Sequence, residues 1–192
     1  MASPDPVLHL VAGPNGAGKT TLATRVIAPV THLPFVNADV IAAERWPLAQ
    51  PEHAYDASQA AALVRQELIA SRASFISETV FSHPSKLVLI RDAQEAGYHV
   101  TLHVVLVPED TTVARVNDRV RRGGHTVPEE KIRQRYQRMW DLVVQGRALA
   151  HRTYVYDNSR AARPLRLIAS YEHGRPVGTA GWPDWAPEGL SP

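Results

Sequence analysis

One short glycine-rich run that ends in a lysine and a threonine is the part of this sequence best suited to chemistry. Residues 13–20 read Gly-Pro-Asn-Gly-Ala-Gly-Lys-Thr, a full match to the phosphate-binding (Walker A) pattern Gly-x-x-x-x-Gly-Lys-Ser/Thr. In that pattern the backbone N–H groups turn toward a polyphosphate, the lysine reaches the β- and γ-phosphates, and the hydroxyl binds Mg²⁺. We therefore expect ATP or GTP to bind with Mg²⁺ at Gly13, Pro14, Asn15, Gly16, Ala17, Gly18, Lys19, Thr20 and Thr21.

Two carboxylates follow short apolar segments that read as strands. The carboxyl ends of parallel strands line the ligand crevice of α/β folds, so we expect Asp39 and Glu78 to face the phosphate loop. Asp39 is our candidate for the base that accepts the proton of an acceptor hydroxyl. The alternative is an aspartate that caps the turn at Val40–Ala43. Glu78, with Thr79 beside it, is expected to contact the acceptor or to hold Mg²⁺ with Thr20, and the alternative is a surface glutamate.

Basic residues gather between positions 115 and 138, although the net charge of the whole chain is only +2. Arginine binds phosphate oxygens through two parallel hydrogen bonds, and the paired glycines at 123–124 permit a hinge between two helices. We therefore predict an arginine-bearing helical lid over about residues 115–138. Arg119 and Arg135 are assigned to catalysis, and Arg122 and Arg133 to the nucleotide. For any single arginine, a solvated helix face is the simpler explanation.

Strands alternate with helices along the chain, which predicts a parallel sheet with helical crossovers. Apolar runs predict strands at 7–12, 34–37, 75–77, 98–107 and 153–156. Periodicity and capping residues predict helices at 21–28, 54–72, 84–96, 109–122 and from 128 onward, and a C-terminal hairpin at 165–177. The expected fold is α/β, a P-loop NTPase with a five-stranded, mostly parallel sheet flanked by helices. We expect one kinase domain over residues 1–180 and a loosely ordered, proline-rich tail over 181–192.

Composition and missing signatures narrow the function classes. The chain has no cysteine, which excludes disulfides and thiolate metal sites. Its small net charge does not favour a nucleic acid partner, and its N-terminus has neither a signal-peptide pattern nor a run long enough to cross a membrane. We therefore expect a cytoplasmic protein. The Asn-Lys-x-Asp guanine signature and a strand ending in paired acidic residues are both missing, which favours a small-molecule kinase over a GTPase switch or an ATPase motor.

Several segments in order along the chain share one further pattern. They are the phosphate loop at 12–21, Asn-Ala-Asp-Val-Ile-Ala at 37–42, Phe-Ile-Ser-Glu-Thr-Val-Phe-Ser at 75–82, Ala-Gly-Tyr at 96–98, the arginines from 115 to 138, Gly-Gly-His-Thr-Val-Pro-Glu at 123–129 and Tyr-Asp-Asn-Ser at 156–159. With these segments the chain resembles the zeta toxin family of P-loop kinases, in particular its small stand-alone bacterial members. The glutamate–threonine strand end and the Gly-Gly-His-x-Val-Pro turn are the most specific parts of the resemblance.

The resemblance implies a kinase that moves the γ-phosphate of ATP to a hydroxyl of an amino sugar. The best-known members phosphorylate UDP-N-acetylglucosamine at its 3′-hydroxyl, so a small-molecule acceptor of that class and an antitoxin protein are the implied partners. It also implies that Lys19 binds phosphate, Thr20 binds Mg²⁺, Asp39 is the base, and Glu78 contacts acceptor or metal. Two alternatives stay open: a kinase for another hydroxyl acceptor, such as an antibiotic or a nucleoside, and a nucleotide-responsive module that touches RNA.

Overall fold

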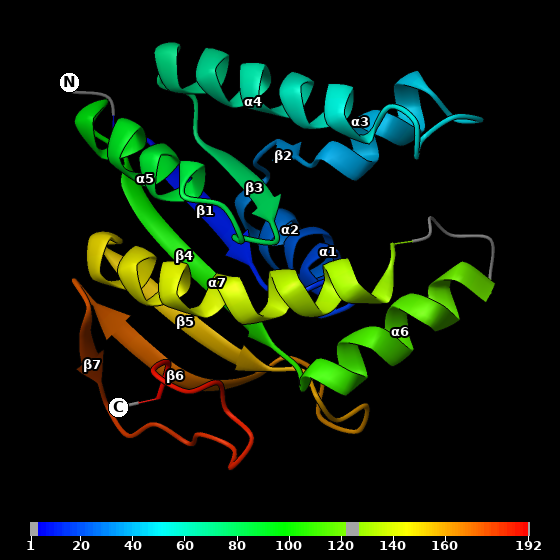
Figure 1. Cartoon of the computed structure of the whole chain (residues 1–192). Coiled ribbons are helices and arrows are strands. Elements are labelled where there is room, and N and C mark those ends of the chain that lie inside the picture. The colour runs from blue at the N-terminus through cyan, green and yellow to red at the C-terminus, as the bar shows by residue number, and fades with distance from the viewer. Residues whose placement is uncertain (1–3, 122–126, 192) are drawn as a thin grey trace.

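A seven-stranded sheet forms the centre of the computed structural model, which describes residues 4–121 and 127–191 (Figure 1). The strands are β1 (Val7–Ala12), β2 (Phe35–Val36), β3 (Phe75–Thr79), β4 (His99–Leu106), β5 (Arg152–Asp157), β6 (Arg166–Glu172) and β7 (Arg175–Val177), in the order β2-β3-β1-β4-β5-β6-β7. The first five are parallel, as predicted. The predicted hairpin is also present, but it adds two antiparallel strands to the sheet at the β5 edge, so the sheet is wider than the five strands expected.

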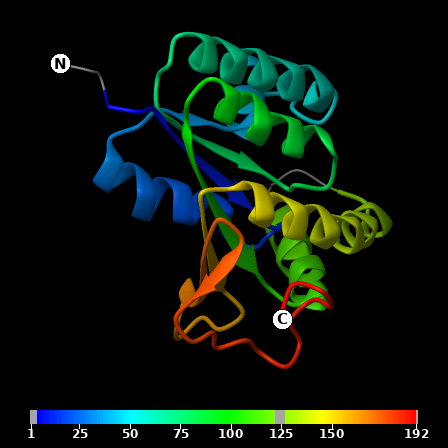
Figure 2. The same cartoon turned by 90° about the vertical axis from the view of Figure 1, so that its left-hand side faces the viewer.

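Helices cover both faces of the sheet (Figures 1 and 2). They are α1 (Lys19–Leu22), η1 (Ala23–Ile27), α2 (Ala28–Thr31), α3 (Ala38–Arg45), α4 (Ala54–Ala70), α5 (Ser85–Glu95), α6 (Glu109–Arg121) and α7 (Glu129–Leu149). One apolar core packs α4, α5 and α7 against Leu8 and Leu10 of β1, and a second packs Leu22 and Ile27 against the opposite face of the sheet. The two cores lie on opposite faces of the sheet because successive side chains of a buried parallel strand point to opposite faces.

The helix that follows the phosphate loop continues beyond the stop predicted near Pro29. A proline has no N–H to donate and its ring crowds the carbonyl four residues earlier, which is why a helix end was expected. The chain instead forms one π-helical turn, η1, immediately before α2, which contains Pro29. This wider turn lets the helical path run on from Lys19 to Thr31.

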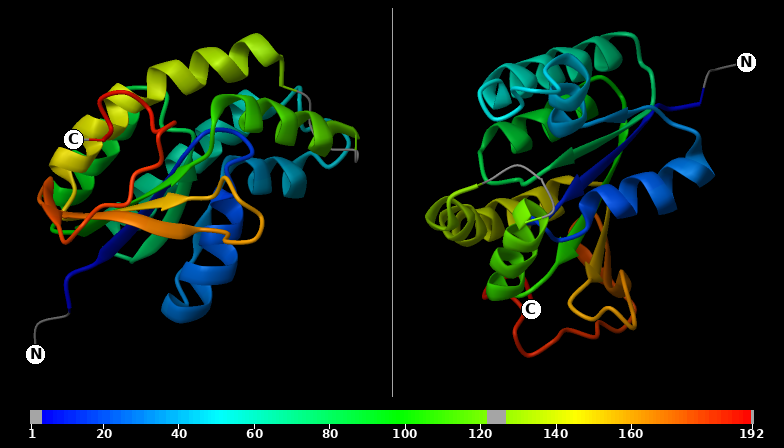
Figure 3. Two further views of the ribbon diagram at one scale, coloured as in Figure 1. Left: turned by 90° about the horizontal axis from the view of Figure 1, so that it is seen from below. Right: turned by 90° about the vertical axis from the view of Figure 1, so that its right-hand side faces the viewer.

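The described part of the proline-rich tail packs on the body of the protein, in contrast to the loose order expected of it. The Leu190 side chain is fully buried, and its carbonyl accepts a hydrogen bond of 2.8 Å from the Arg147 guanidinium of α7. Further back, the Gly181 N–H donates to the Ile168 carbonyl of β6 at 2.7 Å. Figure 3 shows the tail returning alongside α7.

The carboxyl ends of β1, β2 and β3 meet at one edge of the sheet, where the phosphate loop and the loops after β2 and β3 begin. Helices α6 and α7 approach the same edge from beyond β4 (Figure 1). This arrangement positions the candidate site. Among the helices of the described residues, none is long and apolar enough to cross a membrane.

Candidate active site

The phosphate loop is held in shape by glycines at two close contacts. A Cβ at Gly13 would lie 2.6 Å from the Val105 carbonyl oxygen of β4, so any larger residue would push the loop away from the sheet. Gly18 has a φ of 96° and precedes α1, a conformation that side chains with a Cβ rarely adopt. A Cβ there would also collide with the Asn158 amide. The loop therefore depends on the glycines that define its sequence pattern.

Lys19 folds back over this loop. Its ammonium donates to the Pro14 carbonyl at 2.9 Å and lies 3.8 Å from Glu78 Oε1, and its side chain is only 7% exposed. Burial lowers the pKa of Lys19, and the negative charges of Glu78 and Asp39 partly oppose that shift. The ammonium thus lies beside the Glu78 carboxylate and is influenced by the charge of Asp39, the two carboxylates predicted to work with it.

Glu78 is the hub of the hydrogen bonds at the strand ends. Its Oε2 accepts from the Thr20 hydroxyl at 2.8 Å and from the Asn37 amide at 2.7 Å. The side chain is 9% exposed, so the alternative of a surface glutamate is wrong. One carboxylate oxygen therefore lies beside the hydroxyl predicted to bind Mg²⁺.

Asp39 lies in the first turn of α3 but does not cap it. The cap is Asn37, whose Oδ1 accepts from the backbone N–H groups of Asp39 at 2.6 Å and Val40 at 3.2 Å. The capping explanation of Asp39 is therefore wrong. Its carboxylate is exposed and makes no hydrogen bond or ion pair within the described residues. Asn37 was missed from the sequence, although an asparagine at the end of a strand and just before a helix is a capping signal.

A cleft of about 760 Å³ joins most of the predicted site residues. Its walls include Asn15, Gly16, Gly18, Lys19, Thr20, Thr21, Asp39, Glu78, Thr79, Arg119 and Arg135. A smaller recess of about 230 Å³ shares Asp39 and Arg119 with the cleft. Gly13, Pro14 and Ala17 are buried members of the phosphate loop and do not line the cleft.

Arg133 does not line the cleft, although the sequence analysis assigned it to the nucleotide. Its guanidinium pairs with Asp110 at 3.0 Å, Glu109 at 3.3 Å and Glu129 at 2.9 Å, and so joins α6 to α7. The hydrogen bond to Glu129 is the main reason that the pKa of Arg133 is raised. Arg122 and the turn at 123–126 lie outside the described residues.

Asn158 belongs to the Tyr-Asp-Asn-Ser segment but was given no role from the sequence, and it holds the phosphate loop in place. Its amide donates to the Ala17 carbonyl at 2.7 Å, and its Oδ1 accepts from the Leu165 N–H at 3.1 Å. Arg115 of α6 donates to the Asn158 carbonyl at 2.9 Å and to the Gly16 carbonyl at 3.3 Å. No short sequence pattern encodes these contacts, because their partners come from distant parts of the chain.

The cleft has further residues that were not predicted from the sequence. They come from α4, from the loop between β3 and α5, from α5 itself and from α7. They are Ser58, Arg65, Ser82, His83, Lys86 and Lys131. Taken singly, each reads as a solvated residue on a helix or loop, and only the fold brings them to one cavity.

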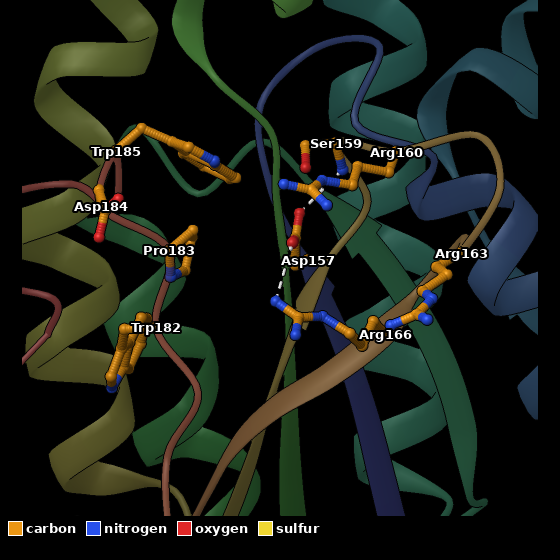
Figure 4. A pocket seen from close by; sticks show the side chains of 9 residues that line it. All are labelled: Asp157, Ser159, Arg160, Arg163, Arg166, Trp182, Pro183, Asp184 and Trp185. Carbon is orange, nitrogen blue, oxygen red and sulfur yellow. Dashed lines mark hydrogen bonds and ion pairs between the residues drawn. The ribbon is translucent and has the colours of Figure 1, made fainter.

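A separate hollow of about 310 Å³ contains none of the predicted site residues (Figure 4). One wall carries Arg160, Arg163 and Arg166, and the other is formed by tail residues 182–185. Asp157 accepts from the Ser159 N–H at 2.9 Å and from Arg166 at 3.3 Å. Burial would raise the pKa of Asp157, but these hydrogen bonds outweigh burial and lower it.

Comparisons with known proteins agree with this architecture. The profile of a family described as "AAA domain" matches residues 8–142. Among solved structures, a protein of the PezAT chromosomal toxin–antitoxin system of Streptococcus pneumoniae is similar over 88% of this chain and 73% of its own, with 14% identity and a TM-score of 0.68. A search of curated proteins found no match.

Two more solved structures show the same fold. The AvrRxo1-ORF1:AvrRxo1-ORF2 complex with sulphate ions contains a chain of which this protein spans 60%, over 90% of its own length, with 18% identity and a TM-score of 0.69. Shikimate kinase from Acinetobacter baumannii, solved in complex with shikimate, is 20% identical over 83% of this chain and 87% of its own, with a TM-score of 0.55. At these identities the likeness concerns the fold.

Proposed function

Because the chain belongs to the AAA domain family, with a phosphate loop at the head of the matched region, we propose that it is an ATP-dependent phosphotransferase. The acceptor is a hydroxyl group of a small molecule. The observation that carries this proposal is the cleft, in which the phosphate loop and Asp39 share one cavity with two arginines, Arg119 and Arg135. The Asp39 carboxylate has no partner among the described residues. Phosphoryl transfer needs a phosphate cradle, a group that orients the acceptor and cations on the transferred group, and little else.

The residues present fit ATP with Mg²⁺. The glycine-rich loop is open to the cleft, Asn15 Oδ1 has no hydrogen-bond partner within the described residues, and the Lys19 ammonium rests on a backbone carbonyl that a phosphate oxygen can replace. Mg²⁺ bound with ATP neutralises phosphate charge and needs few protein oxygen ligands. Thr20 and Glu78 supply two such oxygens, and no cluster of three or more acidic or histidine ligands occurs in the described ranges.

Each residue then has a role that follows from its place. Lys19 holds the β- and γ-phosphates, and Arg119 and Arg135 stabilise the charge that spreads over the transferred phosphoryl oxygens. Asp39 accepts the proton of the acceptor hydroxyl, since its carboxylate is exposed in the cleft and has no other partner in the described chain. Arg133 holds the two lid helices α6 and α7 together instead of contacting ATP.

The acceptor that we propose is UDP-N-acetylglucosamine. Two observations support it: the zeta-toxin-like sequence around Glu78 and Asp39, and the fold shared with a protein of the PezAT toxin–antitoxin system. The cleft volume of about 760 Å³ suits a ligand of that size. An antibiotic or nucleoside acceptor fits the same catalytic groups.

The test is to incubate the pure protein with ATP and Mg²⁺, first with UDP-N-acetylglucosamine and then with a metabolite pool. Mass spectrometry is expected to find the UDP-sugar heavier by one phosphoryl group, and the Asp39→Asn protein should leave it unchanged. A different hydroxyl compound that gains this mass would replace the proposed acceptor. Slow ATP hydrolysis with no phosphorylated product, together with salt-dependent RNA binding, would reject the kinase in favour of the RNA-binding module.

We also propose an antitoxin protein as a partner, since two solved relatives belong to a toxin–antitoxin system and to a two-chain complex. Expression of the protein alone should slow bacterial growth, and Asp39→Asn should relieve that effect. Normal growth under full expression of active protein would reject this partner proposal without touching the kinase proposal.

A further inference from the structure

Two cations, one buried and one partly buried, line the cleft, and the catalytic roles above do not use them. Arg65 lies near the end of α4 and is only 9% exposed, and Lys86 lies in the first turn of α5 and is partly buried. Both line the same cavity as Asp39. The charges acting on Lys19 come from Glu78, Asp39 and Arg119, whereas the charge acting on Lys86 comes from Arg65. Arg65 and Lys86 therefore form a pair of positive charges that is separate from the charges around Lys19.

The face of α4 that lines the cleft leads directly to Arg65. It consists of Ala54, Ser58, Ala61 and Arg65, spaced by four, three and four residues, which places them on one side of a helix. The two alanines and the serine are small and leave the wall open. Arg65 is the long side chain at the inner end of this wall.

Neither cation has an anionic partner within residues 4–121 and 127–191. No carboxylate lies within ion-pair distance of either side chain, and no hydrogen bond from either is formed. Burial lowers the pKa of both groups, and for Lys86 the nearby Arg65 lowers it further. A cation that has lost part of its water and gained no opposite charge is costly to hold in the folded protein.

The position of Lys86 adds to this cost. The first turn of α5 contains no acidic residue, and the N-terminus of a helix carries partial positive charge. A lysine there is repelled by the helix as well as by Arg65. Three positive features thus converge on one side of the cleft, and a bound anion would satisfy all three.

We propose that Arg65 and Lys86, at the start of α5, form an anion site that binds a phosphate or diphosphate group carried by the acceptor. The inference rests on the proposed function, since it assigns the site to the phosphoryl acceptor. Two cations match the double charge of a phosphate better than the single charge of a carboxylate, and the arginine fork fits two phosphate oxygens. The acceptor is therefore a phosphate ester or a nucleotide-linked compound, not a neutral sugar or a carboxylic acid.

The experiment fills the phosphate loop first and then titrates the second site. The protein is saturated with a non-hydrolysable ATP analogue and Mg²⁺, and pyrophosphate is added in a calorimeter. Wild type is expected to bind pyrophosphate, and Arg65→Gln and Lys86→Gln are each expected to weaken that binding about tenfold or more, as for a lost charged hydrogen bond. The matched control is Arg91→Gln, which removes an exposed charge from α5 outside the cleft and should bind like wild type.

Three results would overturn the anion site: no pyrophosphate binding by the loaded wild type, equal binding by the two variants, or acetate binding as tight as pyrophosphate. A second measurement guards against misfolding. Arg65→Met removes a buried charge that has no anionic partner among residues 4–121 and 127–191. The variant should therefore melt a few degrees above wild type without ligand and should lose the thermal shift that pyrophosphate gives. A lower melting temperature with an unchanged shift would contradict the proposal.

The outcomes also separate this site from the kinase itself. If no acceptor is phosphorylated but pyrophosphate binding depends on Arg65 and Lys86, the anion site stands and the kinase proposal falls. If a neutral acceptor is phosphorylated and pyrophosphate binding ignores both residues, the kinase stands and the anion site falls.

Discussion

At the scale of single residues, Lys19 is the cation on which phosphate binding depends. In Lys19→Ala the loop keeps its N–H groups but loses the ammonium that spans the β- and γ-phosphates, so kinase turnover should fall by roughly two orders of magnitude or more. Turnover assays and calorimetric titration with ATP and Mg²⁺ measure the two effects. Lys131→Ala, which removes an exposed lysine from the same cleft, should cost far less. Equal turnover and affinity in Lys19→Ala and wild type would reject the assignment.

Variants at Asp39 and Asn37 test two different roles, proton transfer by Asp39 and helix capping by Asn37. Asp39→Asn keeps the shape but cannot take a proton, so turnover should collapse while ATP affinity and melting temperature stay nearly unchanged. Asn37→Ala removes the cap of α3 and a hydrogen bond to Glu78, and should lower stability by about 1 kcal/mol or more. Thermal melts measure the stability of both variants, and activity per folded molecule measures their catalysis. A stability loss of that size in Asp39→Asn, with normal activity, would return Asp39 to a structural role.

At the scale of elements, α7 packs so closely on the loop after β3 that one methyl group matters. A Cβ at Gly146 would lie 2.9 Å from Cζ and 3.2 Å from Cε1 of the fully buried Phe81 ring. Alanine favours the helix by about 1 kcal/mol, but overpacking typically costs roughly 1–3 kcal/mol. We expect Gly146→Ala to lower the melting temperature by a few degrees.

Because Phe81 lines the cleft, Gly146→Ala should also raise the acceptor KM more than it weakens ATP binding. The matched control is Gly181→Ala, whose added Cβ would meet nothing within 4 Å and should change neither quantity. A more stable Gly146→Ala protein with normal kinetics would show that the ring moves aside without cost.

The sequence was sufficient to predict elements whose signals are local. The phosphate loop, the five parallel strands and the hairpin turn follow from glycine pattern, apolar runs and turn residues within short windows. The partners of charged residues were not predictable in this way. Arg133 and Arg65 both lie on helices. Arg133 is held by three carboxylates, whereas Arg65 is buried in the cleft with no carboxylate partner in the part of the chain that the structure describes. Whether an arginine finds carboxylate partners depends on which helices pack beside it in the fold, and these come from distant parts of the chain.

At the scale of the whole molecule, buried histidines tie stability to pH. His103 of β4 lies between His9 and Tyr156, at 3.0 and 3.3 Å, and burial followed by the charge of His9 lowers its pKa to about 3. An unfolded histidine takes up a proton below about pH 6.5, which the folded His103 does not. The contribution of His103 to stability is therefore fully present above about pH 6.5 and is lost as the pH falls from there toward 3.

Urea unfolding at about pH 7.5 and about pH 5 tests this expectation, since the midpoint should fall between the two. In His103→Gln the difference should be clearly smaller, because glutamine does not titrate. His32→Asn, which removes an exposed histidine at a helix end, should keep the wild-type difference. The same pH dependence in His103→Gln and wild type would place its origin elsewhere.

The π-helical turn before Pro29 has a consequence for comparing this chain with its relatives. A π turn holds one more residue than an α turn, so it acts as a single-residue insertion that the helix absorbs without a loop. Without it, every residue after Ile27 would be rotated by about 100° around the helix axis. A relative with an uninterrupted helix here would align only if a gap of one residue were opened between Ala23 and Ile27. An ungapped alignment would pair residues that lie on different sides of the helix from Ala28 to Thr31, although the phosphate loops themselves are in register.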